Sequence, residues 1–215
     1  MATVTEAWIR IEGWLHHYTP RSGAVLAGPA APELIEAAEV QAGVAFPAEL
    51  VESLLRHDGL TEPANIFPEA TPLAVEEIGE QYAIRMDVAP DVDGFAVHAP
   101  NAEPWWHERW LPFGDAGCGL QVIDMRPGPG RGRVGLAPTS NPADFSEGWP
   151  SLSAYLTAVA NALETGGTVG EWHAYVADDD TLWWDLAGRT EVNGRPLRAV
   201  SALQGGGQFA AGRDA

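Results

Sequence analysis

The sequence predicts an α+β protein with N-terminal helices, then a mostly antiparallel or mixed sheet, then a C-terminal helix and a hairpin extension. Up to residue 82, apolar residues keep the three- and four-residue spacing of amphipathic helices. Short apolar runs separated by glycine-rich turns follow between residues 110 and 137, and a helical pattern returns at residue 151. Helices and strands segregated along the chain are typical of α+β folds rather than of doubly wound parallel sheets.

Four helices are expected in the N-terminal part. Proline opens and glycine ends two of them, from Pro32 to Gly43 and from Pro47 to Gly59, because these residues suit the first turn and the end of a helix. The first and the fourth are predicted from apolar stripes, formed by Trp8, Ile11, Leu15 and Tyr18 and by Val75, Ile78 and Tyr82. Residues 86–104 are rich in Pro, Asp and Gly, and we expect a long loop there, which suggests a binding surface.

The remaining elements are three strands, a helix and a hairpin. The strands are expected at residues 110–113, 120–124 and 133–137, the helix at 151–164, and the hairpin at 172–176 and 182–186. Asn193-Gly194 suits a second tight turn. We expect a main α+β domain at residues 1–165, an extension at 166–203 packed on it, and a disordered tail at 204–215.

The charge of the chain is unusual. Thirty acidic residues stand against twelve basic ones, all arginine, and residues 33–103 alone carry fifteen acidic and two basic residues. A field of this sign repels nucleic acid and anionic lipid and attracts a basic partner, although acidity also serves solubility. We therefore predict a protein partner and no nucleic acid. The residues expected to contact it are the acids and the aromatic anchors Glu62, Glu69, Glu76, Glu77, Glu80, Asp87, Asp91, Asp93, Trp105 and Trp106.

No membrane or secretory signal is evident. The sequence has no run of the ~18 apolar residues that a membrane span needs. Glu6, Arg10 and Glu12 interrupt the first apolar stretch, which is unlike a signal peptide. The single cysteine, Cys118, cannot form an intrachain disulfide. We expect a soluble, cytoplasmic protein without a membrane partner; its oligomeric state is not indicated.

Motifs for catalysis, metals or cofactors are also missing. His16 and His17 are neighbours that point about 100° apart on a helix, so they cannot share a metal as an i, i+4 pair does. Cys118 lies in a glycine-rich turn and would need a base such as His98 or His107 to act as a nucleophile. We expect no metal, no cofactor and no catalysis, with an enzyme using Cys118 as the remaining alternative.

Three stretches in this order resemble a known family. They are Ala38-Glu39 with Gly43, Phe46-Pro47, Leu50 and His57-Asp58-Gly59; then residues 110–114; then residues 122–124 with 132–134 and 151–156. Together they are similar to the SUKH superfamily, which includes the Smi-one/Knr-four cell-wall-assembly regulators of fungi, over residues 5–165. One departure is Cys118-Gly119-Leu120, where the family often has an acidic residue after the glycine turn. The positions that we expect to specify the fold are Glu39, Gly43, Pro47, Asp58, Gly59, Trp110, Pro112, Gly114 and Asp124.

The resemblance implies protein binding without chemistry, and no catalytic residue carries over. Bacterial members are commonly immunity proteins that neutralise a toxin, often a nuclease or a nucleic-acid deaminase. Such a toxin has a basic cleft that an acidic protein can occupy. Our leading hypothesis is an immunity protein that blocks a basic toxin domain. The alternative is a regulatory scaffold that binds an endogenous protein.

Overall fold

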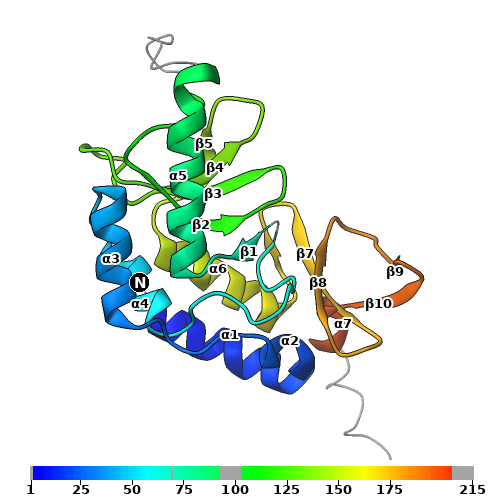
Figure 1. Cartoon of the computed structure of the whole chain (residues 1–215). Helices are drawn as coiled ribbons and strands as arrows, with labels where there is room; N and C mark the ends of the chain where they lie inside the picture. The colour runs from blue at the N-terminus through cyan, green and yellow to red at the C-terminus, as the bar shows by residue number, and fades with distance from the viewer. Residues whose placement is uncertain (1, 69, 93–102, 205–215) are drawn as a thin grey trace, which may run out of the picture.

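The computed structural model describes residues 2–68, 70–92 and 103–204 (Figure 1). It is an α+β structure, as the sequence predicts. The helices are α1 Val4–Tyr18, α2 Pro20–Ala24, α3 Pro32–Ala42, α4 Ala48–Leu54, α5 Val75–Val92, α6 Leu152–Thr165 and α7 Val200–Gln204. The strands are β1 Thr71–Pro72, β2 Trp110–Asp115, β3 Gly119–Asp124, β4 Val134–Pro138, β5 Asp144–Trp149, β6 Thr168–Val169, β7 Trp172–Ala177, β8 Leu182–Asp185, β9 Glu191–Val192 and β10 Arg195–Ala199.

The strands form two antiparallel sheets. The first has the order β1-β2-β3-β4-β5, and the second has the order β6-β7-β10-β9 with β8 paired to β7. In Figure 1, α5 runs across the front of the first sheet, α1 and α6 pack against each other below it, and the second sheet lies to one side. Strand β2 is buried from Trp110 to Gly114, on both of its faces, which fits a strand covered by helices on either side.

Aromatic side chains fill the centre of the molecule. Trp8, Trp110 and Tyr155 are among the largest side chains that are fully buried. The ring of Tyr155 on α6 lies 5.5 Å from that of Phe67 and 6.0 Å from that of Phe113, so the helix is anchored to the loop before β1 and to β2. Each such aromatic buries a large apolar area, worth roughly 1.5–3 kcal/mol relative to exposure.

Two boundaries differ from the prediction. Helix α5 continues to Val92, so the first part of the predicted loop at 86–104 is helical. Pro90 lies in the last turn; it has no amide hydrogen to donate within the helix, and α5 ends two residues later. The helix predicted to run to Gly59 ends as α4 at Leu54. The rest of the predicted loop, residues 93–102, lies outside the described residues.

The C-terminal region begins at a sharp helix end. Gly166 adopts the left-handed conformation (φ +71°) that ends α6, and its amide donates to the carbonyl of Ala162. The predicted hairpin is β7 and β8, and Asn193 and Gly194 (φ +49° and +76°) form the tight turn between β9 and β10. Of the predicted disordered tail at 204–215, Gln204 is instead the last residue of α7, and residues 205–215 fall outside the described residues. None of the described helices has the length and apolar character needed to cross a membrane.

Candidate functional site

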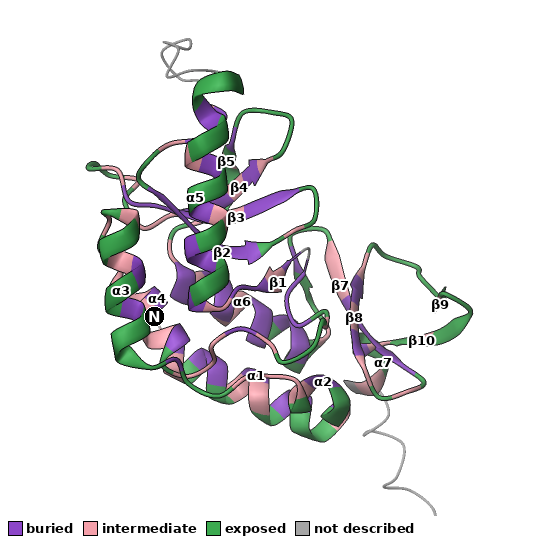
Figure 2. Ribbon diagram, in the orientation of Figure 1, coloured by how far each residue is buried: buried purple, intermediate pink, exposed green. Residues whose placement is uncertain are grey.

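Helix α5 gathers most of the acidic residues predicted to contact a partner. All of those on the helix have exposed side chains: Glu76, Glu77, Glu80, Asp87 and Asp91 (Figure 2). Glu62 is exposed as well, but it lines a separate cleft beside α2 and β8. Glu69 and Asp93 lie outside the described residues. The structure therefore brings together five of the eight predicted acids on one helix.

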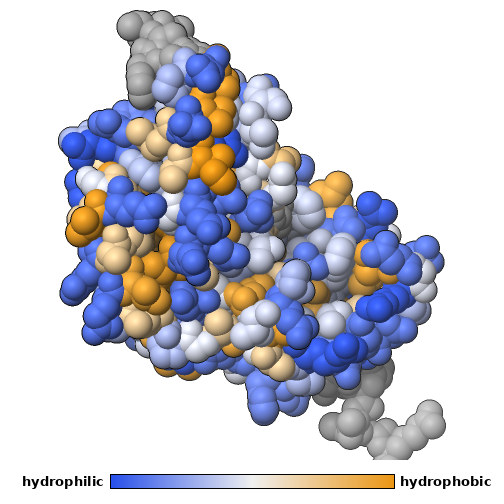
Figure 3. Space-filling model, in the orientation of Figure 1, coloured by the Kyte–Doolittle hydropathy of each residue, from blue (hydrophilic) through white to orange (hydrophobic). Residues whose placement is uncertain are grey.

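An apolar stripe runs among these acids. Ile84, Val88 and Val92 follow each other at i, i+4 and i+8, and their residues are 54%, 37% and 54% exposed. Figure 3 shows apolar surface on this end of α5. We call the exposed acids and this stripe together the α5 face. This stripe was not predicted from the sequence, because residues beyond 86 were expected to form a loop. The four-residue spacing of these three apolar residues was the signal that could have indicated it.

One charged residue in the middle of α5 is buried. Arg85 is buried, its guanidinium lies 4.9 Å from the ring centroid of Trp105, and it donates to the carbonyl of Pro138 at 3.3 Å. Burial lowers the pKa of Arg85. Arg85 is the only basic residue on α5, so the exposed charges of the helix are all negative.

The two tryptophans predicted as surface anchors are in the interior. Trp105 and Trp106 are only 5% and 2% exposed. The indole N–H of Trp105 donates to the carbonyl of Thr139, and the ring of Trp106 packs edge-on against that of Trp110. Neither side chain reaches the surface, because both fill the space between α5 and the first sheet. Aromatic residues are common in cores as well as at interfaces, and their type alone does not separate the two roles.

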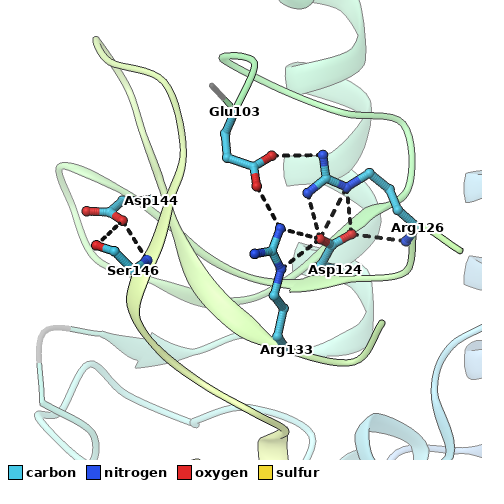
Figure 4. Close-up of polar contacts among 6 residues, drawn as sticks. All are labelled: Glu103, Asp124, Arg126, Arg133, Asp144 and Ser146. Carbon is cyan, nitrogen blue, oxygen red and sulfur yellow. Dashed lines mark hydrogen bonds and ion pairs between the residues drawn. The ribbon is translucent and has the colours of Figure 1, made fainter. Parts of the chain in front are cut away.

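The densest cluster of charged groups surrounds Asp124, at the end of β3 (Figure 4). Asp124 is 1% exposed and accepts hydrogen bonds from the guanidinium groups of Arg126 (2.7 Å) and Arg133 (2.9 Å). Glu103 bridges the same two arginines, at 2.8 Å from Arg126 and 2.6 Å from Arg133. Two positive and two negative groups thus neutralise one another.

The environment of Asp124 keeps it ionised. Burial alone would raise the pKa of this carboxyl group, but its hydrogen bonds to Arg126 and Arg133 outweigh burial, and the pKa lies below the ordinary value. The arginines are held from their other sides by rings, Arg126 over Trp110 at 5.2 Å and Arg133 over Phe145 at 4.1 Å. The cluster joins the segment before β2 to the β3–β4 connection. Asp124, one of the predicted fold positions, therefore has a structural role.

The first group of predicted fold positions builds the turn between α3 and α4. Gly43 ends α3 in the left-handed conformation (φ +65°). A side-chain oxygen of Glu39 accepts from the amide of Phe46 at 2.7 Å, and Pro47 is the residue before the first turn of α4. The predictions of a helix end at Gly43 and of a helix start at Pro47 are confirmed.

Asp58 and Gly59 act at the beginning of α5 rather than at the end of α4. A side-chain oxygen of Asp58 accepts from the amide of Val75, the first residue of α5, at 2.7 Å. Gly59 has φ +69°, and a Cβ there would lie 2.7 Å from the backbone nitrogen of Ala74. The expected helix-ending role was wrong, because a carboxylate can cap a helix that begins 17 residues later in the chain. These residues hold the start of the α5 face in place.

His57 is fixed by two acceptors. Its Nδ1 lies 2.7 Å from the carbonyl oxygen of Ala27, and its Nε2 lies 2.9 Å from a carboxylate oxygen of Glu12. Arg56 also pairs with Glu12. Burial would raise the pKa of Glu12, but the hydrogen bonds from Arg56 and His57 outweigh burial and lower the pKa. This cluster fastens α1 to the segment after α4.

The last fold positions are in β2. Trp110 is fully buried. The pairing of β2 with β3 shifts register between Pro112 and Gly114, as in a β-bulge. A Cβ at Gly114 would lie 3.1 Å from the Cβ of Ala70, so this glycine permits a close approach to the segment before β1.

Cys118 is exposed in the turn between β2 and β3. Its carbonyl oxygen accepts from the amide and the hydroxyl of Thr139, and within the described part of the chain no hydrogen bond joins the thiol to a histidine. His98 lies outside that part. His16 and His17 are exposed on α1. Residues 2–68, 70–92 and 103–204 contain no group of three or more His, Cys, Asp or Glu residues able to hold a metal ion.

These features define an α+β protein whose charged clusters around Asp124 and Glu12 are paired internally and whose helix α5 displays five exposed carboxylates. Residues 29–158, more than half of the chain, match the model of the SMI1/KNR4 family (SUKH-1), and the chain belongs to this family. The predicted resemblance to the SUKH superfamily is thereby confirmed. A comparison with curated proteins found no match. Membership of the family supports a non-enzymatic role in binding or immunity.

Proposed function

We propose that this protein is a cytoplasmic immunity protein that binds and neutralises a basic toxin domain through the α5 face. The observation that carries the proposal is that α5 displays five carboxylates around an apolar stripe, with its only arginine buried. Family membership supports binding in general, and the charge of the face supports the basic character of the partner.

The two parts of the face would contribute differently to binding. The carboxylates attract a basic surface over long range and raise the association rate, an effect that salt screens. The stripe of Ile84, Val88 and Val92 offers apolar area that a partner can cover, and such desolvated centres carry most of the affinity of an interface. A toxin that acts on nucleic acid needs a basic surface for its substrate, so one complementary face can cover that surface and block it.

Binding kinetics of the full chain with the basic toxin domains encoded beside its gene test the proposal. We expect the triple variant E80Q/D87N/D91N to lower the association rate at least tenfold at low salt, and less at 0.5 M salt. The variant I84A/V88A should mainly raise the dissociation rate. A charge-matched control, E36Q/D178N/E191Q, changes exposed acids on other elements and should leave both rates within about twofold of the wild type.

Two results would count against the proposal. If the α5 variants bind as tightly as the control, the α5 face is not the contact surface. If no toxin domain binds and an endogenous protein copurifies through the same face, the protein is a regulatory scaffold instead.

A further inference from the structure

A cavity of about 270 Å³ lies between the first sheet and the beginning of the second. Strands β3, β4 and β5, helix α6 and Pro68 contribute part of its lining, and residues 169–172 of the C-terminal region contribute the rest. Helix α5 does not line it, so this cavity is separate from the α5 face. The lining residues used below are Gln121, Asp144, Glu147, Trp149, Glu171 and Trp172.

The charges that line the cavity are all negative. Asp144, Glu147 and Glu171 line it, and the lining contains no arginine, lysine or histidine. Glu147 and Glu171 are exposed and make no hydrogen bond or ion pair with any described residue. Asp144 accepts from the amide and the hydroxyl of Ser146 through one oxygen only. The cavity therefore offers carboxylate oxygens that have no partner in the described part of the chain.

Two indole rings share the lining with these acids. Trp149 and Trp172 are half-buried, and Trp149 rests against the ring of Tyr155 at 6.1 Å. An indole face attracts a cation within about 6 Å of the ring centroid, and it does so most strongly where water is partly excluded. Aromatic rings together with unpaired carboxylates favour an organic cation.

The size and the spacing narrow the class of cation. The described residues provide no cluster of three ligands for a metal ion, so the three carboxylates are too far apart to coordinate one together. The volume is below the roughly 300 Å³ at which cavities for drug-sized ligands begin, so it suits a single side chain. Gln121 also lines the cavity: its buried side-chain oxygen accepts no hydrogen bond from the described residues, and its side-chain N–H group donates to the hydroxyl of Tyr155 at 3.4 Å.

We propose that this cavity receives an arginine side chain of a bound polypeptide. A guanidinium group is planar, stacks on indole rings and carries five N–H donors, so it can reach carboxylates that are spread apart, whereas an ammonium group is a compact charge. The SUKH-1 match ends at residue 158, and Glu171 and Trp172 lie beyond it. The C-terminal region thereby gains a role as one wall of a binding site. The inference does not depend on the proposed toxin or on the α5 face.

NMR titration of the full chain tests this proposal through the indole N–H signals of Trp149 and Trp172, assigned with W149F and W172F. The probe is the blocked tripeptide acetyl-Gly-Arg-Gly-amide. Three matched probes are the same peptide with citrulline, which keeps the shape without the charge, the same peptide with lysine, and free arginine amide. We expect saturable shifts of both indole signals with the arginine peptide, weaker binding of the lysine peptide and of arginine amide, and no saturation with the citrulline peptide.

A pair of variants locates the site. E147Q/E171Q should weaken the arginine peptide about fivefold, because two partly exposed charge contacts are lost. E36Q/E191Q removes the same charge from α3 and β9 and should change the affinity less than twofold. Equal binding of the citrulline peptide, or equal weakening by the two variants, would overturn the site. If the lysine peptide binds as tightly as the arginine peptide, the cavity does not prefer a guanidinium group. If free arginine amide binds as tightly as the arginine peptide, the arginine need not belong to a polypeptide.

Discussion

Replacing Asp124 by asparagine tests whether the cluster at the end of β3 is a structural lock. The substitution keeps the shape of the side chain but removes the negative charge of the carboxylate, which accepts hydrogen bonds from both Arg126 and Arg133. Breaking a buried ion pair costs about 3–5 kcal/mol, but both arginines are partly exposed and keep Glu103 as a partner. We therefore expect D124N to lower the free energy of unfolding by about 2–3 kcal/mol.

Urea unfolding followed by tryptophan fluorescence measures this loss, with an unchanged m-value as the sign that the denatured state is unaffected. The control is E164Q, which breaks the exposed pair between Arg10 and Glu164 and should cost less than about 1 kcal/mol. The reasoning is refuted if D124N costs no more than E164Q.

The effect should also depend on pH. The pKa of Asp124 in the folded protein lies below its ordinary value of 3.8, because its hydrogen bonds to the arginines outweigh the burial that would raise it. The folded state therefore releases this proton more readily than the unfolded state, and the stabilisation is complete above about pH 4. It is lost as the pH falls through the lowered pKa, so the difference between the wild type and D124N should persist at pH 7 and shrink only in acid.

Two further substitutions test single contacts by the same unfolding measurement. Gly166→Ala should destabilise the protein by about 2 kcal/mol or more, because φ is +71° and the new Cβ would lie 2.6 Å from the backbone nitrogen of Ser201. The control, Gly167→Ala, meets only the Thr165 hydroxyl and should cost no more than about 0.5 kcal/mol. Equal costs of the two substitutions would show that α7 does not pack tightly there. Asp58→Ala should lower the free energy of unfolding by about 1 kcal/mol, because it removes the acceptor for the first amide of α5. Amide hydrogen exchange should become faster in the first turn of α5 and stay unchanged in α6. Faster exchange throughout the protein would contradict a local cap.

Several contacts hold helix α5 in place, and this has a consequence for the proposed function. Asp58 and Gly59 fix the start of α5, and Arg85 ties its middle to the first sheet through Trp105 and Pro138. A helix held at several points can present its outer face without reordering on binding, which lowers the entropic cost of association. The residues that specify the fold thus also support the proposed contact surface.

Local chemistry accounts for the elements that were predicted correctly. Proline and glycine placed the turn from α3 to α4, and the apolar stripes located α1 and α6, because these signals depend only on near neighbours. Strand β5 gave no such signal, since its burial pattern lacks alternation and only two of its residues are partly buried. Strand β1 has two residues and exists only through its pairing with β2.

The sequence alone determined the α+β class, the family resemblance, the acidity of the region around α5 and the absence of a recognisable catalytic motif. Only the tertiary structure decided that Trp105 and Trp106 are interior, that Asp58 caps a distant helix and that residues from both sheets enclose one cavity. The physical reason is that composition and periodicity report interactions within a few residues. Burial and capping across long loops depend on which segments pack together, and a single segment does not carry that information.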